Sequence, residues 1–146
     1  MPGIYVHIPF CRTACHYCDF HFSTSLQRTG EFVNALLKEV GMRKESGVWD
    51  GSEFNTLYFG GGTPSVLSSK DLKRITDAIK TKFLPENLAS FIEATIEVNP
   101  EDVTESALQG WLDAGFDRLS IGVQSFEDSK LKWMNRKHSA DEAVKA

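Results

Sequence analysis

The chain has 146 residues, and 16 Lys and Arg against 20 Asp and Glu leave a formal charge of −4. Hydrophobic residues make up 41% and charged residues 25%, a globular mix that excludes wholesale disorder. The length excludes a closed eight-fold β/α barrel, which needs about 250 residues. The acidic balance excludes the electrostatic footprint of a nucleic-acid-binding protein.

Strands and helices are predicted to alternate along the chain. Four runs rich in β-branched and aromatic residues predict strands at 4–8, 56–60, 94–98 and 119–123. Apolar residues at helical spacing predict helices between them. These stripes are Phe32, Val33, Leu36, Leu37 and Val40; Leu72, Ile75, Ile79 and Phe83; and Leu108, Trp111 and Leu112. The alternation predicts an α/β fold of four β/α units, with a parallel sheet and right-handed crossovers.

Capping residues mark the ends of the predicted helices. Ser68 and Thr104 are predicted to open the second and third helices as N-caps, and Gly115 is predicted to follow the third. Ser125 is predicted to cap a short fourth helix that runs through Met134. Each strand is therefore followed by a defined loop before the next helix begins.

The strand residues separate into two faces, because side chains alternate along a strand. The apolar face comprises Ile4, Val6, Ile8, Leu57, Phe59, Ala94, Ile96, Val98, Leu119, Ile121 and Val123. The other face comprises Tyr5, His7, Thr56, Tyr58, Thr95, Glu97, Ser120, Gly122 and Gln124. The apolar face is predicted to pack on the helices. The polar face is predicted to line a partly wet interior that holds a ligand, since a packed barrel would fill with branched apolar residues.

A capping box near the C-terminus opens one more helix. It spans Ser139 to Glu142, and only residues 143–146 follow it, which is too little for a helix to stand alone. We therefore expect residues 1–146 to be the N-terminal part of a larger core domain whose C-terminal remainder is absent. The strand at 119–123 is then predicted to be an edge, or to be covered by another chain.

No export signal or membrane span is evident in the sequence. The N-terminal MPGIYVHIPF has no basic region and no long apolar run, and a spanning helix needs roughly 20 apolar residues. We expect a cytoplasmic protein that binds no nucleic acid and meets membranes only through a partner. In that reducing compartment, clustered thiols favour metal or redox chemistry over disulfides.

The three cysteines are clustered and odd in number, so a disulfide framework cannot use them all. They are Cys11, Cys15 and Cys18. Thiolates are soft ligands suited to zinc or iron–sulfur clusters. Structural zinc prefers four ligands, and the fourth would come from His7, His16 or His21. Three thiolates on a four-iron cluster would leave one iron open. This pattern favours a cluster over zinc, and zinc over a purely structural group.

Unusual segments also follow the other three strands: GGGTP at 60–64, EVNP at 97–100 and GVQSF at 122–126. Ligands bind at the C-terminal ends of parallel strands, so these segments are predicted to converge on one site. The glycines form either a tight turn or a close approach to a ligand, and they match neither a P-loop nor G-x-G-x-x-G.

Three polar residues in or after these segments each have two interpretations. Glu97 is either a paired structural carboxylate or an acceptor for a ribose diol. Gln124 is either a capping amide or a ligand contact. Arg136 is either solvated or paired with a ligand carboxylate.

Taken together, these segments resemble the radical S-adenosylmethionine enzymes. The resemblance rests on C-x3-C-x-Y-C at 11–18 with the segments at 60–64, 97–100 and 122–126, in that order. The opening YVHIPFC at 5–11 narrows it to the oxygen-independent coproporphyrinogen III oxidase family, closest to its haem chaperone (HemW) branch. The family fold is a partial six-fold β/α barrel with a C-terminal domain, of which four β/α units are present here.

The resemblance implies a [4Fe–4S] cluster and S-adenosylmethionine as cofactors. The implied cluster ligands are Cys11, Cys15 and Cys18, with the amino and carboxylate groups of S-adenosylmethionine on the open iron. The implied cofactor contacts are Tyr5, Gly61, Gly62 and Thr63 at the methionine end, Glu97 at the ribose, Phe20 near the adenine, and Gln124 and Arg136. In such enzymes the reduced cluster cleaves the sulfonium to methionine and a 5′-deoxyadenosyl radical.

Two departures bear on the function that the resemblance implies. Decarboxylating members carry a further cysteine two residues after the third, where this chain has Phe20, and an extension before the first strand. Both departures favour a haem chaperone that binds and delivers haem in the full-length protein. The alternative is oxidative decarboxylation of coproporphyrinogen III, and a third is a non-catalytic metal-binding module, so enzymatic turnover stays open. Expected partners are haem or porphyrinogen, an electron donor and a haem-acceptor protein.

Overall fold

A computed structural model describes residues 2–49, 53–86 and 88–146 as a parallel sheet with helices between its strands. The strands are β1 (Gly3–Ile8), β2 (Thr56–Gly61), β3 (Glu93–Val98) and β4 (Arg118–Ile121), in the spatial order β1-β2-β3-β4. The helices are α1 (Thr29–Glu45), α2 (Ser69–Phe83), α3 (Glu105–Asp113), α4 (Asp128–Trp133) and α5 (Ala140–Lys145), with 3₁₀ turns η1 (Pro64–Val66) and η2 (Pro100–Asp102). The predicted α/β fold of four β/α units is confirmed.

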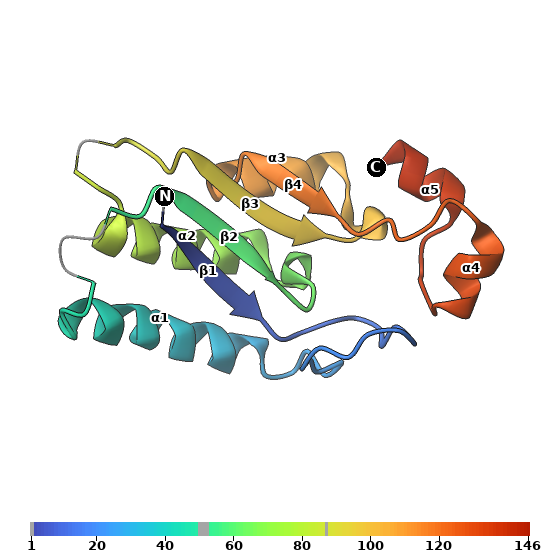
Figure 1. The fold of residues 1–146 in the computed structure, drawn as a ribbon, viewed down its shortest axis with the longest axis horizontal. Helices are drawn as coiled ribbons and strands as arrows, with labels where there is room; N and C mark the ends of the chain where they lie inside the picture. The colour runs from blue at the N-terminus through green and yellow to red at the C-terminus, as the bar shows by residue number, and fades with distance from the viewer. Residues whose placement is uncertain (1, 50–52, 87) are drawn as a thin grey trace.

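Helices α1, α2 and α3 lie along the sheet, whereas α4 and α5 lie beyond the C-terminal ends of the strands (Figure 1). All three strand pairs are parallel. Within the described part of the chain β4 pairs only with β3, so the prediction of an edge strand is confirmed. No helix among the described residues is long and apolar enough to cross a bilayer.

The core forms between the apolar sheet face and the helices. Its fully buried side chains include Ile8, Leu57, Phe59, Ile96, Leu72, Ile75 and Val33. Phe59 and Phe116 meet edge to face with ring centroids 4.9 Å apart. The predicted helix stripes therefore supply the helical half of the core, with the exception of Leu112, which is 60% exposed.

The opposite sheet face is polar, but it is not uniformly wet. Tyr5 is 57% exposed, whereas Thr95 is fully buried. Thr95 lies in register between Tyr58 and Arg118, and its hydroxyl donates to Glu93 at 3.1 Å. The expectation of a wet interior is therefore wrong at the middle of β3, where longer neighbours flank a short side chain.

Local hydrogen bonds confirm most of the predicted helix ends. Ser68 Oγ accepts from the Asp71 N–H at 3.1 Å, and Thr104 Oγ1 accepts from the Ala107 N–H at 3.2 Å. Gly115 follows α3 with φ +93°. These side chains satisfy backbone groups that a helix leaves free at its ends.

The chain after β4 differs from the prediction. The strand ends at Ile121 rather than at residue 123, and α4 begins at Asp128 with Glu127 as its N-cap. Ser125 Oγ accepts from the Glu127 N–H at 3.1 Å, so it stabilises the turn before the helix instead of capping it. The reason is a sharp turn at Gln124, whose φ is +65°. The predicted capping box of α5 at Ser139 is confirmed.

Candidate cofactor site

A pocket of about 450 Å³ lies at the C-terminal ends of the four strands. Its wall includes the predicted site residues Cys11, Cys15, Cys18, Phe20, Gly61, Gly62, Thr63, Glu97, Gln124 and Arg136. Each of the four segments that follow a strand contributes to this wall. The convergence expected from the strand ends is therefore present in the fold.

The cysteines lie on a loop that closes on itself. The Ser23 N–H donates to Pro9 O at 2.8 Å, and the Cys11 N–H donates to Ser23 O at 3.0 Å. Within the loop, the Cys18 N–H donates to Cys15 O at 3.1 Å. All three thiols are free and partly buried, so the loop presents three soft donors to one pocket.

The thiol of Cys11 has an environment that favours the neutral form. Burial raises its pKa, and the nearby thiols of Cys18 and Cys15 add to this effect. A hydrogen bond from Thr63 Oγ1 at 3.4 Å and the charge of Arg136 oppose it. Binding of a soft cation would therefore release protons from this loop.

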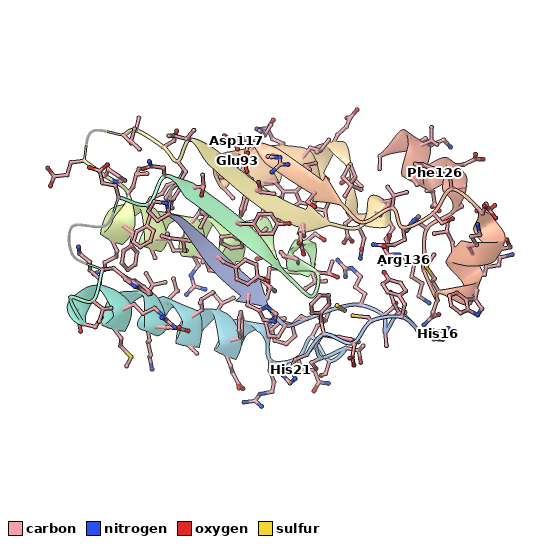
Figure 2. The ribbon with its side chains drawn as sticks, viewed as in Figure 1. His16, His21, Glu93, Asp117, Phe126 and Arg136 are labelled. Atoms are coloured by element: carbon pink, nitrogen blue, oxygen red, sulfur yellow. The ribbon has the colours of Figure 1, made fainter. Side chains whose placement is uncertain are left out.

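The three histidines offered as a fourth zinc ligand lie elsewhere. His16 Nδ1 is hydrogen-bonded to Trp133 O at 2.7 Å, and His7 Nδ1 lies 3.2 Å from the hydroxyl of Tyr5. His21 is exposed at the outer side of the cysteine loop (Figure 2). Among the described residues, none of these histidines lines the pocket, and no group of three His, Cys, Asp or Glu side chains has the arrangement of a single-ion site.

The glycine segment fastens β2 to the cysteine loop. The Gly62 N–H donates to Ile8 O at 2.9 Å and the Thr63 N–H to Phe10 O at 2.7 Å. A Cβ on Gly62 would lie 2.6 Å from Phe10 O, and Gly61 has φ +107°. The tight-turn interpretation of these glycines is therefore confirmed, whereas contact with a ligand stays a prediction.

Glu97 uses both carboxylate oxygens inside the pocket. Oε1 accepts from the Tyr58 hydroxyl at 2.7 Å, and Oε2 accepts from the Gly61 N–H at 3.2 Å. The hydrogen bond to Glu97 is the main cause that raises the pKa of Tyr58. Because both donors are neutral and each oxygen keeps a free lone pair, the carboxylate retains the capacity to accept a diol.

Arg136 is built into the pocket wall, so the solvated interpretation is wrong. Nη2 donates to Asn99 Oδ1 and to Gly122 O, each at 2.7 Å, and Nη1 lies 3.5 Å from Cys15 Sγ. Its Nε is the buried side-chain atom without a hydrogen-bond partner in the described structure. Figure 2 shows the side chain between the end of β4 and the cysteine loop. An orphaned guanidinium N–H is suited to an anionic ligand group.

Gln124 occupies a strained turn at the rim. The Ser125 N–H donates to Val123 O at 2.8 Å across Gln124, whose φ is +65°, as in a classic γ-turn. Such a conformation costs a residue other than glycine about 1–3 kcal/mol and persists where its surroundings impose it.

Two predicted contacts lie at or outside the edge of the pocket. Phe20 is on the wall but 70% exposed. Tyr5 is on the polar face of the sheet, where it stacks on Tyr58 with ring centroids 6.0 Å apart. In the described structure it is not part of the pocket wall. Burial and the charge of Glu97 raise the pKa of Tyr5.

Several residues that support the pocket wall were not predicted from the sequence. Asp102 accepts from Ser65 Oγ at 2.6 Å and from Arg12 Nε at 3.3 Å, so it joins the cysteine loop to η1. Tyr58 and Asn99 hold Glu97 and Arg136 in place. Asn99 lies inside the EVNP segment, which was a usable signal, whereas Asp102 carries no local signal of its long-range contacts.

The donor set fits an iron–sulfur cluster together with a zwitterionic nucleoside ligand. Three thiols suit iron, the free Nε of Arg136 suits a carboxylate, and the carboxylate of Glu97 suits a pair of hydroxyls. These features lie on one wall.

Comparison with known proteins supports this interpretation. Residues 5–146 match the family described as the radical SAM superfamily, whose membership implies S-adenosylmethionine and an iron–sulfur cluster. Heme chaperone HemW of Bacillus subtilis (strain 168) is 39% identical over 94% of this chain and 36% of its own length. Anaerobilin synthase of Escherichia coli O157:H7 is 37% identical over 97% of this chain and 31% of its own length.

The fold is also that of a solved relative. Coproporphyrinogen III oxidase (HemN) from Escherichia coli, described as a radical SAM enzyme, superposes with a TM-score of 0.82 and 28% identity, covering 98% of this chain and 34% of that protein. The chain thus spans about a third of the length of the proteins that it matches. The chain belongs to the radical SAM superfamily, and within it is similar to HemW haem chaperones and to coproporphyrinogen III oxidase.

Proposed function

We propose that this chain is the cofactor-binding front part of a haem chaperone that binds a [4Fe–4S] cluster and S-adenosylmethionine. The observation that carries the proposal is the meeting of three free thiols, Glu97 and the orphaned Nε of Arg136 in one pocket. Residues 1–146 are then the N-terminal part of a radical SAM core domain, within a longer protein that would act in the cytoplasm.

The cysteine loop would hold the cluster. Cys11, Cys15 and Cys18 would ligate three irons, and the fourth would be left for the amino and carboxylate groups of S-adenosylmethionine. When bound, cluster and cofactor supply one-electron chemistry at the sulfonium. The protein contributes the enclosing loop, whose backbone is tied to β1 and to the glycine segment.

The remaining pocket residues would hold S-adenosylmethionine. Gly61, Gly62 and Thr63 would contact its methionine end, with Tyr5 beside it. Glu97 would accept from the ribose hydroxyls, since its present donors leave lone pairs free. Gln124 and Arg136 would complete the wall, and Phe20 at the rim would lie near the adenine.

Residue 20 distinguishes haem delivery from porphyrinogen decarboxylation. Phe20 stands where decarboxylating relatives have a further cysteine, and the most similar relatives reported above include a protein named as a heme chaperone. The rest of the full-length protein would help to bind haem, which would then be passed to an acceptor protein. An electron donor would reduce the cluster.

The structural likeness to coproporphyrinogen III oxidase favours an enzymatic alternative. In that case the full-length protein would decarboxylate the propionates of coproporphyrinogen III. A metal-binding module without turnover is the third function.

The test uses the full-length protein, reconstituted anaerobically. One sample is supplied with reductant, S-adenosylmethionine and coproporphyrinogen III, and a second sample is titrated with haem. We expect haem binding without protoporphyrinogen. Product formation would establish the decarboxylase instead, and a protein that takes up zinc but no iron would leave only the binding module.

A further inference from the structure

His138 is buried outside the cofactor pocket, and neither motif nor mechanism accounts for it. Its side chain is 0% exposed. The ring nitrogens have separate partners: Nε2 lies 3.0 Å from Val123 O, and Nδ1 lies 3.2 Å from Glu101 Oε2. Since a carbonyl oxygen only accepts, Nε2 carries a proton that it donates to Val123.

The carbonyl of Val123 is the one that closes the turn at Gln124. It accepts from the Ser125 N–H at 2.8 Å and from the His138 ring at 3.0 Å. A γ-turn with positive φ is strained for glutamine and needs support from its surroundings. The buried ring supplies such support from a residue 15 positions further along the chain.

Arg136 fastens the residue before Val123 in the same way. Its Nη2 donates to Gly122 O at 2.7 Å, so the carbonyls of two consecutive residues are held by side chains two positions apart in the segment between α4 and α5. Arg136 lines the pocket, whereas His138 is not part of its wall in the described structure. His138 reaches the pocket wall by two routes, through Val123 O in the turn and through Glu101, whose side chain lines the pocket. His138→Gln separates the two routes, because its amide can still donate to Val123 O but lacks the second ring nitrogen.

We propose that His138 is a positioning residue for the S-adenosylmethionine pocket, which acts by holding Val123 O and thereby keeping Gln124 in its left-handed conformation at the pocket wall. Glu101 fixes the ring from η2 through Nδ1. The inference rests on the proposed function, because the ligand is the one assigned there.

The test measures equilibrium binding of S-adenosylmethionine, and of unreactive S-adenosylhomocysteine, to the reconstituted full-length protein. We expect His138→Ala to raise the dissociation constants of both ligands about tenfold, because one hydrogen bond that holds the turn at Gln124 is lost. His138→Gln, whose amide can still donate to Val123 O, should bind within about threefold of the wild type. The iron content should be the same in all three proteins.

The matched control is Ser139→Ala, which weakens α5 at the adjacent residue but leaves the bond to Val123 O intact. Its affinity should equal that of the wild type. Equal losses in Ser139→Ala and His138→Ala would overturn the proposal in favour of general loosening, and so would wild-type affinity in His138→Ala. If His138→Ala does not fold, a tenfold loss in a folded His138→Gln would overturn it.

A double-mutant cycle tests whether the effect passes through Gln124. If it does, Gln124→Ala with His138→Ala should lose about as much affinity as Gln124→Ala alone. Losses that multiply to about a hundredfold would overturn the proposal. If the wild-type protein loads its cluster but binds no S-adenosylmethionine, the proposed function itself is refuted. If the wild type binds S-adenosylmethionine and His138→Ala binds it equally well, only this inference is refuted.

Discussion

The guanidinium of Arg136 lies 3.5 Å from the thiol of Cys15, a residue 121 positions earlier in the chain. The same side chain bonds Asn99 after β3 and Gly122 after β4. One residue therefore joins three of the segments that converge at the strand ends. Because those segments enclose the pocket, its shape depends on this side chain as much as on the strands.

Arg136→Lys is expected to weaken S-adenosylmethionine binding more than cluster loading. The compact ammonium cannot reproduce a planar fork that reaches three acceptors and leaves Nε for a ligand. Calorimetry on the reconstituted full-length protein should show a dissociation constant raised by at least about tenfold, with iron content retained. Arg28→Lys is the control, because its partner Glu31 forms a surface pair of small energetic value. Equal effects of the two variants would contradict the assignment.

Cys15→Ala is expected to abolish cluster assembly. Removing one of three thiolates leaves two protein ligands, too few to retain a four-iron cluster. Iron analysis after anaerobic reconstitution should fall from about four irons per chain to near zero. Phe20→Ala, on the same loop but without a thiol, should keep its iron. Unchanged iron in Cys15→Ala would refute the ligand assignment.

The capping box of α5 makes stability depend on pH in the acid range. Hydrogen bonds from the Ser139 N–H and hydroxyl lower the pKa of Glu142 below its ordinary value of 4.5. Because its pKa is lower in the folded than in the unfolded protein, ionised Glu142 stabilises the fold. This stabilisation is complete above the pKa of the unfolded state and is lost as the pH falls through the pKa of the folded state. The stability difference between wild type and Glu142→Gln should therefore shrink below about pH 4.5. A difference that is constant down to about pH 3 would contradict this account.

Ser139→Ala removes the other half of the box. Loss of an N-cap serine costs about 0.5–2 kcal/mol of helix stability, so the free energy of unfolding should fall by that amount in urea. Because α5 is a short terminal helix, protection of its amides from hydrogen exchange should fall further than protection of the sheet. An equal loss of hydrogen-exchange protection in α5 and in the sheet would show that α5 unfolds only together with the whole domain.

The sequence predicts elements whose signals are local, and it misses contacts between distant residues. The parallel sheet and the convergence of its strand ends follow from the alternation of strands and helices, and the caps at Ser68 and Thr104 follow from residue type and position. Arg136 was predicted as a pocket residue, but its hydrogen-bond partners were not, because they lie in three other segments. The early end of β4 was missed because Gln124 adopts positive φ without the glycine that usually signals it.

Gly62→Ala is expected to disrupt the junction between the glycine segment and the cysteine loop. The new Cβ would lie 2.6 Å from Phe10 O and 2.8 Å from Ile8 O, both backbone atoms that cannot rotate away. The bonds from the Gly62 and Thr63 N–H groups would then have to lengthen, which also moves Thr63 away from the thiol of Cys11. Iron retention after reconstitution should fall severalfold, and the free energy of unfolding should drop by about 1–3 kcal/mol.

Gly30→Ala is the matched control for this substitution. Gly30 lies in the first turn of α1, and a Cβ there meets nothing within 4 Å. Since alanine is the better helix former by about 0.8–1 kcal/mol in a helix interior, Gly30→Ala should be neutral or stabilising, with full iron content. Destabilisation by Gly30→Ala equal to that by Gly62→Ala would show that the effect is general to adding a methyl group. Destabilisation confined to Gly62→Ala would identify close backbone packing as the reason that the cysteine loop and the glycine segment act as one unit.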